Sequence, residues 1–260
     1  MKVTLITGAS SGIGEAFAHR LAEEGHNLVL IARSEDKLRA LCDELKAKHK
    51  ITAHFVAIDL IDFEADERLF RETEQHGLEV NFLINNAGFG SMGDFATLDL
   101  EKELEIINLN ISALVALTHR YIKPMRERRS GTIINVSSAA GFQPLPFMAT
   151  YAASKAFVSS FTEAIAEENR PFGIQVMALC PGSTKTNFFA ASGIDRPIQV
   201  KGQETVDDVV DTAMNSLNGK KSKVVSGWTN YLASLSTNFV PNALITRVVG
   251  KALRSKYQKS

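Results

Sequence analysis

Residues 3–14 read VTLITGASSGIG, and this stretch decides the fold of the 260-residue chain. Val3, Leu5 and Ile6 form an apolar run suited to a buried strand, and the periodic apolar residues that begin at Ile13 are typical of a helix. The glycines between them predict a turn that points backbone N–H groups and a helix N-terminus at a phosphate group. Their spacing is G-x-x-x-G-x-G and differs from the usual G-x-G-x-x-G fingerprint, so a plain glycine-rich connection stays an alternative at this point.

Apolar, strand-like runs alternate with helical segments along the rest of the chain. Strands are predicted at residues 27–31, 53–58, 80–84, 132–136 and 174–179, and helices at 34–49, 63–76, 100–128 with a break near Pro124, and 150–169. This alternation predicts an α/β fold, a Rossmann-like doubly wound parallel sheet of about seven strands with helices on both faces. We expect one domain over residues 1–260, with ligands bound beyond the carboxyl ends of the strands.

The composition is that of an ordinary globular protein, with 45% hydrophobic and 22% charged residues. The two cysteines, Cys42 and Cys180, fall inside predicted elements and are expected to be buried thiols in a reducing compartment. The first strand begins almost at Met1, which leaves no room for a signal peptide. No window of about 18 uninterrupted apolar residues predicts a transmembrane helix. We therefore expect a cytoplasmic protein.

The formal net charge of zero conceals an asymmetry between the two ends of the chain. No acidic residue follows Asp211, whereas eight Lys and Arg residues do, so the last 49 residues carry a charge of +8 and the first 211 carry −8. Helical spacing of apolar residues on both sides of Pro241 predicts an amphipathic basic extension over residues 228–260. We expect this extension to pack over the ligand site or a neighbouring subunit. Peripheral contact with a membrane surface is the alternative, and nucleic acid is not an expected partner.

Polar residues stand where the second and third predicted strands end. Arg33 occupies the place where an acid would bind the ribose 2′-hydroxyl of NAD, and its planar guanidinium favours the 2′-phosphate of NADP, with help from Lys37. A plain surface arginine at a helix start is the alternative. Asp59, which Leu60 follows, predicts either a contact with the adenine amino group or a turn aspartate.

The fifth predicted strand leads to three side chains with linked chemistry. Ser138 follows that strand, and Tyr151 lies 13 residues further on, in the next predicted helix. Lys155 comes four residues after Tyr151, so both side chains share one face of the helix. An ammonium group beside a phenol stabilises the phenolate and is expected to lower the phenol pKa from about 10. A Tyr-x-x-x-Lys pair alone is common by chance, but with Ser138 and the glycine turn it points to acid–base chemistry beside a nucleotide.

These motifs together resemble the short-chain dehydrogenase/reductase family over about residues 1–190. The resemblance is carried by TGASSGIG at 7–14, NNAG at 85–88, Ser138, YAASK at 151–155 and Pro181-Gly182, in the family's order and spacing. It implies an NADP(H)-dependent oxidoreductase that transfers a hydride between the nicotinamide and a carbonyl or alcohol. It further implies that Tyr151 is the general acid/base, that Lys155 binds the nicotinamide ribose, and that Ser138 hydrogen-bonds the substrate oxygen. An active-site asparagine of the family matches Asn110, with Asn108 as the alternative.

The same resemblance implies a set of cofactor-binding residues along the strand ends. They are Gly8, Ser10, Ser11, Gly12, Ile13, Gly14, Arg33, Lys37, Asp59, Leu60, Asn86, Ala87, Gly88, Tyr151, Lys155, Pro181, Gly182, Thr184 and Thr186.

Substrate specificity in this family comes from the segments after the fifth and sixth strands, and a substrate loop is expected over residues 186–205. Here these segments carry Phe142, Leu145, Phe147, Met148, Phe188 and Phe189. Such walls favour an apolar carbonyl substrate, such as a ketoacyl or steroid-like ketone. Core or subunit contacts are the alternative role for several of them. The resemblance also implies a homodimer or homotetramer, formed through the helices near 100–128 and 150–169.

Two other functions fit parts of the sequence. Gly8, Ser10 and Gly12 match the G-x-S-x-G nucleophile elbow of α/β-hydrolases, but that fold needs an acid and a histidine further along, and the last histidine is His119. A non-catalytic NADP-binding sensor or scaffold on the same fold is the second alternative, because a fold alone does not establish activity. No Cys/His spacing predicts a metal site.

Overall fold

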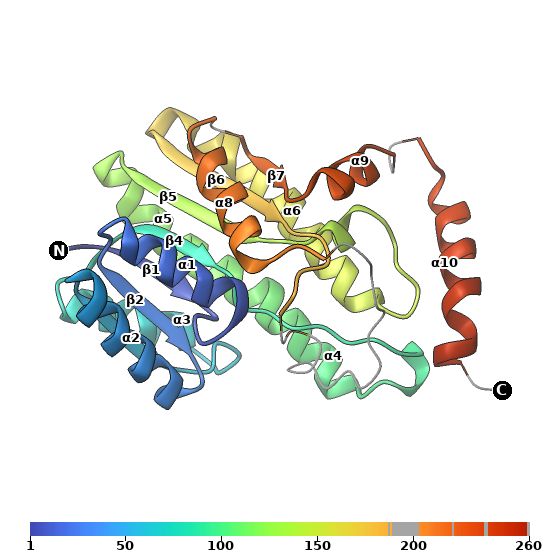
Figure 1. Cartoon of the computed structure of the whole chain (residues 1–260), viewed down its shortest axis with the longest axis horizontal. Coiled ribbons are helices and arrows are strands. Elements are labelled where there is room, and N and C mark those ends of the chain that lie inside the picture. Colours follow the sequence, from blue (N-terminus) through green and yellow to red (C-terminus); the bar gives the residue numbers. More distant parts are fainter. Residues whose placement is uncertain (187, 189–202, 220, 237–238, 259–260) are drawn as a thin grey trace.

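The computed structural model describes residues 1–186, 188, 203–219, 221–236 and 239–258 (Figure 1). In these residues one parallel sheet has the strand order β3-β2-β1-β4-β5-β6-β7. Its strands are β1 (Lys2–Thr7), β2 (Leu28–Ala32), β3 (Ala53–Ala57), β4 (Glu79–Asn85), β5 (Gly131–Val136), β6 (Ile174–Cys180) and β7 (Lys223–Val225). The strand order reverses between β1 and β4, and doubly wound sheets bind ligands at such a switch point. The predicted Rossmann-like fold class is therefore confirmed.

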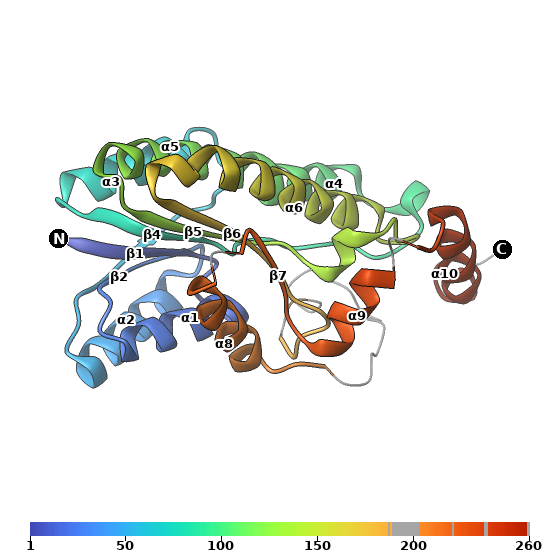
Figure 2. The same cartoon turned by 90° about the horizontal axis from the view of Figure 1, so that it is seen from above.

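Helices cover both faces of the sheet, as Figure 2 shows. One face carries α1 (Gly12–Glu23), α2 (Glu35–His49) and α8 (Val206–Leu217), and the other carries α3 (Ala65–Gln75), α5 (Leu114–Arg128) and α6 (Ala149–Asn169). Each layer buries an apolar stripe against the strands; Phe17 of α1 and Leu117 of α5 are 0% and 1% exposed. The central strands are therefore buried on both faces, which is why they read as continuous apolar runs.

The predicted helix over residues 100–128 is interrupted, but not at the predicted place. α4 (Leu100–Ile107) leads into a π-helical segment (Asn108–Ala113), and α5 then continues through Pro124. A proline inside a helix removes a backbone hydrogen bond, and α5 compensates because Tyr121 and Met125 beside Pro124 are buried against the sheet. The prediction of a break near Pro124 is therefore wrong, and the irregular turn lies at the segment that contains Asn110.

The C-terminal extension forms α9 (Trp228–Ser236) and α10 (Asn242–Tyr257), and Pro241 is the N-cap of α10. α10 lies beyond the end of the sheet, apart from both helical layers (Figure 1). Among the described helices, none is long and apolar enough to cross a membrane. Of the predicted substrate loop, residues 187 and 189–202, which include Phe189, lie outside the described residues.

Candidate active site

The turn between β1 and α1 has the backbone that its glycines require. Gly8 and Gly12 have φ angles of +65° and +63°, in the left-handed region that favours glycine. A Cβ atom on Gly14 would lie 2.3 Å from the carbonyl oxygen of Gly8, so only glycine lets α1 start this close to the turn. The N-cap of α1 is Ser11, whose side chain makes no capping hydrogen bond. The first N–H groups of α1 can therefore bind an anion.

Asn86, which follows β4, fastens this turn to the neighbouring strand. Its Nδ2 donates to the carbonyl oxygens of Thr7 at 2.9 Å and Gly8 at 3.2 Å. The Thr7 Oγ1 accepts from the N–H groups of Asn86 and Ala87, both at 2.9 Å. Asn86 and Ala87 thus form a scaffold beneath the glycine turn.

Arg33 and Asp59 lie beside each other where β2 and β3 end. Arg33 Nη1 is 3.7 Å from Asp59 Oδ2, and the Arg33 side chain is 74% exposed. Asp59 Oδ1 accepts from the N–H of Ile61 at 3.1 Å, which is the turn geometry that the sequence left as an alternative. Lys37 is exposed in the first turn of α2, and Leu60 packs against the core under α3 and α5. A solvent-exposed ion pair is weak, so Arg33 can exchange Asp59 for an anionic ligand at small cost.

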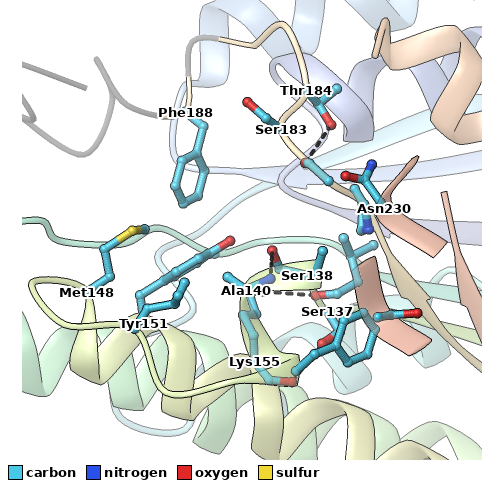
Figure 3. Close-up of a pocket in the computed structure, with 18 of the residues that line it drawn as sticks. Ser137, Ser138, Ala140, Met148, Tyr151, Lys155, Ser183, Thr184, Phe188 and Asn230 are labelled. Carbon is cyan, nitrogen blue, oxygen red and sulfur yellow. Dashed lines mark hydrogen bonds between the residues drawn. The ribbon is translucent and has the colours of Figure 1, made fainter. Parts of the chain in front are cut away.

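Ser138, Tyr151 and Lys155 meet where β5 ends and α6 begins (Figure 3). Ser138 Oγ accepts from the N–H of Ala140 at 3.1 Å and caps the short 3₁₀ turn Ala139–Phe142. Figure 3 shows the Tyr151 and Ser138 side chains facing each other across the site. Lys155 Nζ donates to the carbonyl oxygen of Val136 at 2.9 Å and lies 5.9 Å from the centre of the Tyr151 ring.

Burial dominates the ionisation of Tyr151 and Lys155. Removal from water raises the pKa of the Tyr151 phenol, and the neighbouring Ser138 side chain opposes this rise. Burial also lowers the pKa of Lys155 to about 8. The expected lowering of the Tyr151 pKa by Lys155 is therefore not found among these side chains, because desolvation prevails and the ammonium group is directed at Val136. The phenol keeps its proton at neutral pH.

The π-helical segment turns Asn110 into the site. Its Nδ2 donates to the carbonyl oxygen of Phe89 and to the hydroxyl of Ser154, both at 3.0 Å, and its Oδ1 accepts from the N–H of Phe89 at 3.2 Å. A Cβ atom on Gly88 would lie 2.8 Å from Asn110 Oδ1 and 3.4 Å from Lys155 Nζ. Asn108 is exposed, whereas Asn110 is buried. Of the two asparagines left open by the sequence, Asn110 is the one beside Lys155.

The segment after β6 forms the opposite wall of the site. The carbonyl oxygen of Pro181 accepts from the N–H of Ala139 at 2.8 Å, and Thr184 Oγ1 donates to the carbonyl oxygen of Gly182 at 3.2 Å. Thr186 faces the glycine turn, because a Cβ atom on Gly12 would lie 3.4 Å from its Cγ2. A nucleotide held at the β1–α1 turn would therefore contact this segment as well.

A cavity of about 790 Å³ opens between these walls. Ser138, Tyr151 and Lys155 line one side of it. The predicted apolar residues Phe142, Met148 and Phe188 also line the cavity, and the rings of Phe188 and Tyr151 are 5.4 Å apart.

Phe147 is not among the residues that line this cavity. Its φ angle is +67°, and its ring lies 5.7 Å from that of Tyr257 in α10. The ring of Phe147 thus packs on α10, and its expected role in a substrate wall stays a prediction.

Four residues of α9 that the sequence does not single out also line the cavity: Thr229, Asn230, Ala233 and Ser234. The residues of α9 that the sequence pattern does single out are Leu232 and Leu235, and these are 48% and 42% exposed. Nothing in the local pattern indicates that the more polar face of this helix looks into a cavity.

Comparison with known proteins places the chain among oxidoreductases. The family model of short chain dehydrogenases matches residues 2–197. A 7beta-hydroxysteroid dehydrogenase of Mediterraneibacter gnavus is 34% identical over 229 residues, which are 87% of this chain and 86% of that protein. A very-long-chain 3-oxoacyl-CoA reductase of Mus musculus is 29% identical over 264 residues, 98% of this chain and 81% of that protein.

Solved structures are similar over nearly the whole chain. A short-chain dehydrogenase from Sphingobium yanoikuyae in complex with NADPH has a TM-score of 0.83 at 29% identity, covering 100% of this chain and 98% of that one. A structure of a 7beta-hydroxysteroid dehydrogenase has a TM-score of 0.86 at 30% identity, covering 96% of both chains.

Proposed function

The chain belongs to the short-chain dehydrogenase family of oxidoreductases acting on CH–OH and C=O groups, and we propose that it interconverts a bulky apolar ketone and its alcohol with NADP(H). The observation that carries this proposal is the placement of the Tyr151 and Ser138 side chains, which face each other in the wall of the cavity with Lys155 close by. Lys155 lies behind the phenol and is held by a backbone carbonyl oxygen. This arrangement supports the delivery of a proton from Tyr151 to a carbonyl oxygen.

We propose NADP(H) as the cofactor because residues of the β1–α1 turn fit its phosphates. The start of α1 offers N–H groups to the pyrophosphate, and Gly8 and Gly12 let the backbone approach it. The guanidinium of Arg33 is exposed at the place where a 2′-phosphate would lie. The complex of the Sphingobium yanoikuyae protein with NADPH supports this choice. The bound cofactor would supply the hydride.

In the proposed reduction the carbonyl oxygen of the substrate lies between Ser138 and Tyr151. Ser138 donates a hydrogen bond to this oxygen, and Tyr151 gives it a proton as negative charge develops there. The raised pKa of Tyr151 keeps the proton in place before this step. Once the proton has left, the ammonium group of Lys155 offers positive charge to the phenolate. General acid assistance of this kind accelerates a reaction by about 10²–10⁴-fold.

Asn110 takes part in this proposal as a positioning residue. Both protons of its Nδ2 are occupied, one by the carbonyl oxygen of Phe89 and one by the hydroxyl of Ser154. These bonds hold the segment after β4 against α6, which carries Tyr151 and Lys155. The amide of Asn110 therefore helps to hold α6, and with it Tyr151 and Lys155, in place beside the segment after β4.

Apolar side chains on two sides of the cavity support a bulky carbonyl substrate, either steroid-like or a long-chain ketoacyl compound. Phe142 and Met148 come from the segment after β5, and Phe188 lies opposite Tyr151. The names of the relatives from Mediterraneibacter gnavus and Mus musculus agree with substrates of this size. A cavity of about 790 Å³ can enclose such a molecule.

The test is NADPH consumption, followed by its near-ultraviolet absorbance, with a panel of steroidal ketones, 3-oxoacyl thioesters and short aliphatic ketones. We expect turnover with bulky apolar members and much slower turnover with short ones. Binding of NADPH without consumption by any carbonyl would favour the sensor alternative. The hydrolase alternative needs a histidine late in the chain, and the last one, His119, is exposed on α5, on the face of the sheet opposite α1 (Figure 2).

We also propose that the chain forms a homodimer or homotetramer through α4 and α6. Leu100 and Leu104 of α4 and Phe157 of α6 are 65%, 49% and 41% exposed, and such apolar surface fits a second subunit. Light scattering during gel filtration measures the assembly. A monomer at micromolar concentration would contradict this proposal.

Peripheral membrane contact and a cytoplasmic location both stay predictions. Trp228 and Val248 of the basic extension are 70% and 61% exposed, which is compatible with an interfacial helix pair. Sedimentation with anionic and with neutral vesicles tests the membrane contact. Absence of sedimentation with anionic vesicles would leave α9 and α10 as parts of the protein surface.

A further inference from the structure

Glu204, which lies just before α8, connects three parts of the cavity wall. Its backbone N–H donates to the carbonyl oxygen of Ser183 at 3.1 Å, and its carbonyl oxygen accepts from the N–H of Lys185 at 2.9 Å. Its carboxylate accepts from the hydroxyl of Ser226 at 2.7 Å and from Asn230 Nδ2 at 3.0 Å. Ser226 is completely buried. The segment after β6, the end of β7 and α9 are therefore joined at this carboxylate.

These partners determine which way the amide of Asn230 faces. Asn230 Nδ2 donates to Glu204 Oε2 and, at 2.9 Å, to the carbonyl oxygen of Ser226. A carboxylate and a carbonyl oxygen can only accept, so the amide nitrogen, and not the amide oxygen, must point at them. Both Nδ2 protons are thereby used. The amide oxygen is left on the side of the cavity, where Figure 3 shows Asn230 beside Ser183 and Thr184.

Two glycines leave the space that this arrangement needs. A Cβ atom on Gly182 would lie 2.0 Å from Asn230 Nδ2 and 2.5 Å from its Oδ1, so the amide lies flat against the backbone of Gly182. Gly227 has a φ angle of +79°, and a Cβ atom there would lie 2.8 Å from both Asn230 Nδ2 and Glu204 Cδ. No side chain or backbone N–H in the described part of the chain donates to Asn230 Oδ1. The acceptor is oriented but unused by the residues that the structure describes.

We infer that Asn230 Oδ1 accepts a hydrogen bond from the ligand in the cavity, and that Glu204 and Ser226 are the positioning residues that aim it. This inference rests on the proposed function. The matching group is an N–H or O–H donor, and two sources offer one: the carboxamide of the nicotinamide, and a hydroxyl group of the substrate remote from its reacting carbonyl. Asn230 is thus a specificity-determining residue and takes no part in proton transfer.

Glu204→Gln changes what orients the Asn230 amide while keeping the size of the side chain at position 204. A glutamine side chain has nearly the same size, but its amide both donates and accepts, so only the carbonyl oxygen of Ser226 still requires the nitrogen of Asn230 to face it. With one of the two acceptor-only partners lost, the amide of Asn230 turns over more readily and then presents a donor where the ligand needs an acceptor. Asn230→Ala removes the acceptor itself. We expect both variants to weaken the binding of the same ligand by about five- to tenfold, which is the usual effect of losing one uncharged hydrogen bond.

Two matched pairs of probes distinguish the sources of the donor. The first pair is NADPH and its reduced 3-acetylpyridine analogue, in which a methyl group replaces the amide NH₂; their dissociation constants are measured by fluorescence. The second pair is a steroidal ketone that carries one hydroxyl group and the same ketone without it; their kcat/KM values are measured with saturating NADPH. In one of the two pairs, we expect both variants to impair the donor-bearing member by about five- to tenfold, as a higher dissociation constant or a lower kcat/KM. The same quantity for the member without the donor should change by less than about twofold. Glu167→Gln, which removes an exposed carboxylate 2.8 Å from Arg170, is the matched control and should change neither pair.

Equal losses for both members of each pair would mean that Asn230 serves only the packing of α9, and they would overturn the inference. Unchanged values for all four probes would overturn it as well. If Asn230→Ala does not fold, as thermal melting would reveal, Glu204→Gln alone decides between these outcomes. A wild-type protein that binds no NADPH or reduces no ketone would refute the proposed function, and this inference with it, before any variant is compared.

Discussion

The inner part of the cavity and its outer rim are held in different ways. Asn110, Tyr151 and Lys155 are 1%, 8% and 4% exposed. Hydrogen bonds hold Asn110 to Phe89 and Ser154 and hold Lys155 to the carbonyl oxygen of Val136. At the rim, Tyr257 of α10 contacts the ring of Phe147 and, through its hydroxyl, the sulfur of Met92 at 2.6 Å. Groups that react are thus held by bonds that are costly to break, whereas groups that border the substrate are held by contacts that change cheaply.

Tyr151→Phe is the strongest test of the inner part. It removes the proton donor but keeps the ring that packs against Phe188, so we expect kcat to fall by about 10²–10⁴-fold with unchanged NADPH affinity. Steady-state NADPH consumption and an NADPH titration measure the two quantities. Tyr231→Phe, which removes a hydroxyl from the half-exposed face of α9, is the control. Nearly full activity of Tyr151→Phe would remove the phenol from the mechanism.

Lys155→Met tests how much stability the protein loses by burying the ammonium group of Lys155. The pKa of Lys155 is about 8 in the folded chain against 10.5 for an ordinary lysine, so the unfolded state binds more protons between these values. Stability should therefore rise with pH from about 8 to 10, and the full cost of burial is present below pH 8. We expect Lys155→Met to raise the free energy of unfolding at neutral pH by roughly 1–3 kcal/mol and to flatten this rise, while activity is lost.

Urea unfolding of wild type and Lys155→Met across this pH range measures the effect. The comparison stops near pH 10, because the raised pKa of Tyr151 makes the folded state lose stability above that value. An equal pH slope in both proteins would show that the site does not penalise the ammonium group.

Arg33→Ala tests an exposed residue that nonetheless belongs to the cofactor side of the site. We expect the dissociation constant of NADPH to rise about tenfold and that of NADH to stay within about twofold, because only NADPH has the 2′-phosphate. Lys37→Ala, in the first turn of α2, should raise the dissociation constant of NADPH by a smaller factor. Equal losses for both cofactors would contradict the assignment of Arg33 to the phosphate.

Tyr257→Ala addresses the rim, where we expect the smallest effect. Loss of its contacts with Phe147 and Met92 should raise KM for a bulky ketone by about two- to threefold, with kcat and NADPH affinity unchanged. Steady-state kinetics with a bulky and a short ketone measure this change. A large loss of kcat would contradict the comparison, since α10 would then act on the inner part.

Local signals in the sequence were enough to predict the fold and the pairing of Tyr151 with Lys155. Strands buried on both faces read as apolar runs, glycine turns separate them from helices, and a spacing of four residues puts two side chains on one helical face. The same spacing did not indicate which way the pKa of Tyr151 moves, because desolvation depends on the whole surrounding fold.

Features that depend on distant parts of the chain could not be predicted in this way. Asn230 and Glu204 are 26 residues apart and meet only because β7 and α9 return to the segment after β6. Phe147 has a positive φ angle that a phenylalanine rarely adopts, and its ring contacts Tyr257, which is 110 residues further along the chain. Pro124 is a strong local signal for a break, yet tertiary packing of α5 overrides it.

The π-helical segment Asn108–Ala113 makes chain length critical at this place in the protein. Such a wide turn accommodates an inserted residue, and each residue of a regular helix adds a rotation of about 100°. Deleting a single residue here would turn the π-helical segment into regular α-helix. Asn110 would then rotate away from Phe89 and Ser154, although almost every side chain would be retained. A library of single-residue deletions across residues 100–128 should therefore lose function most sharply at this segment, more so than a library of conservative substitutions.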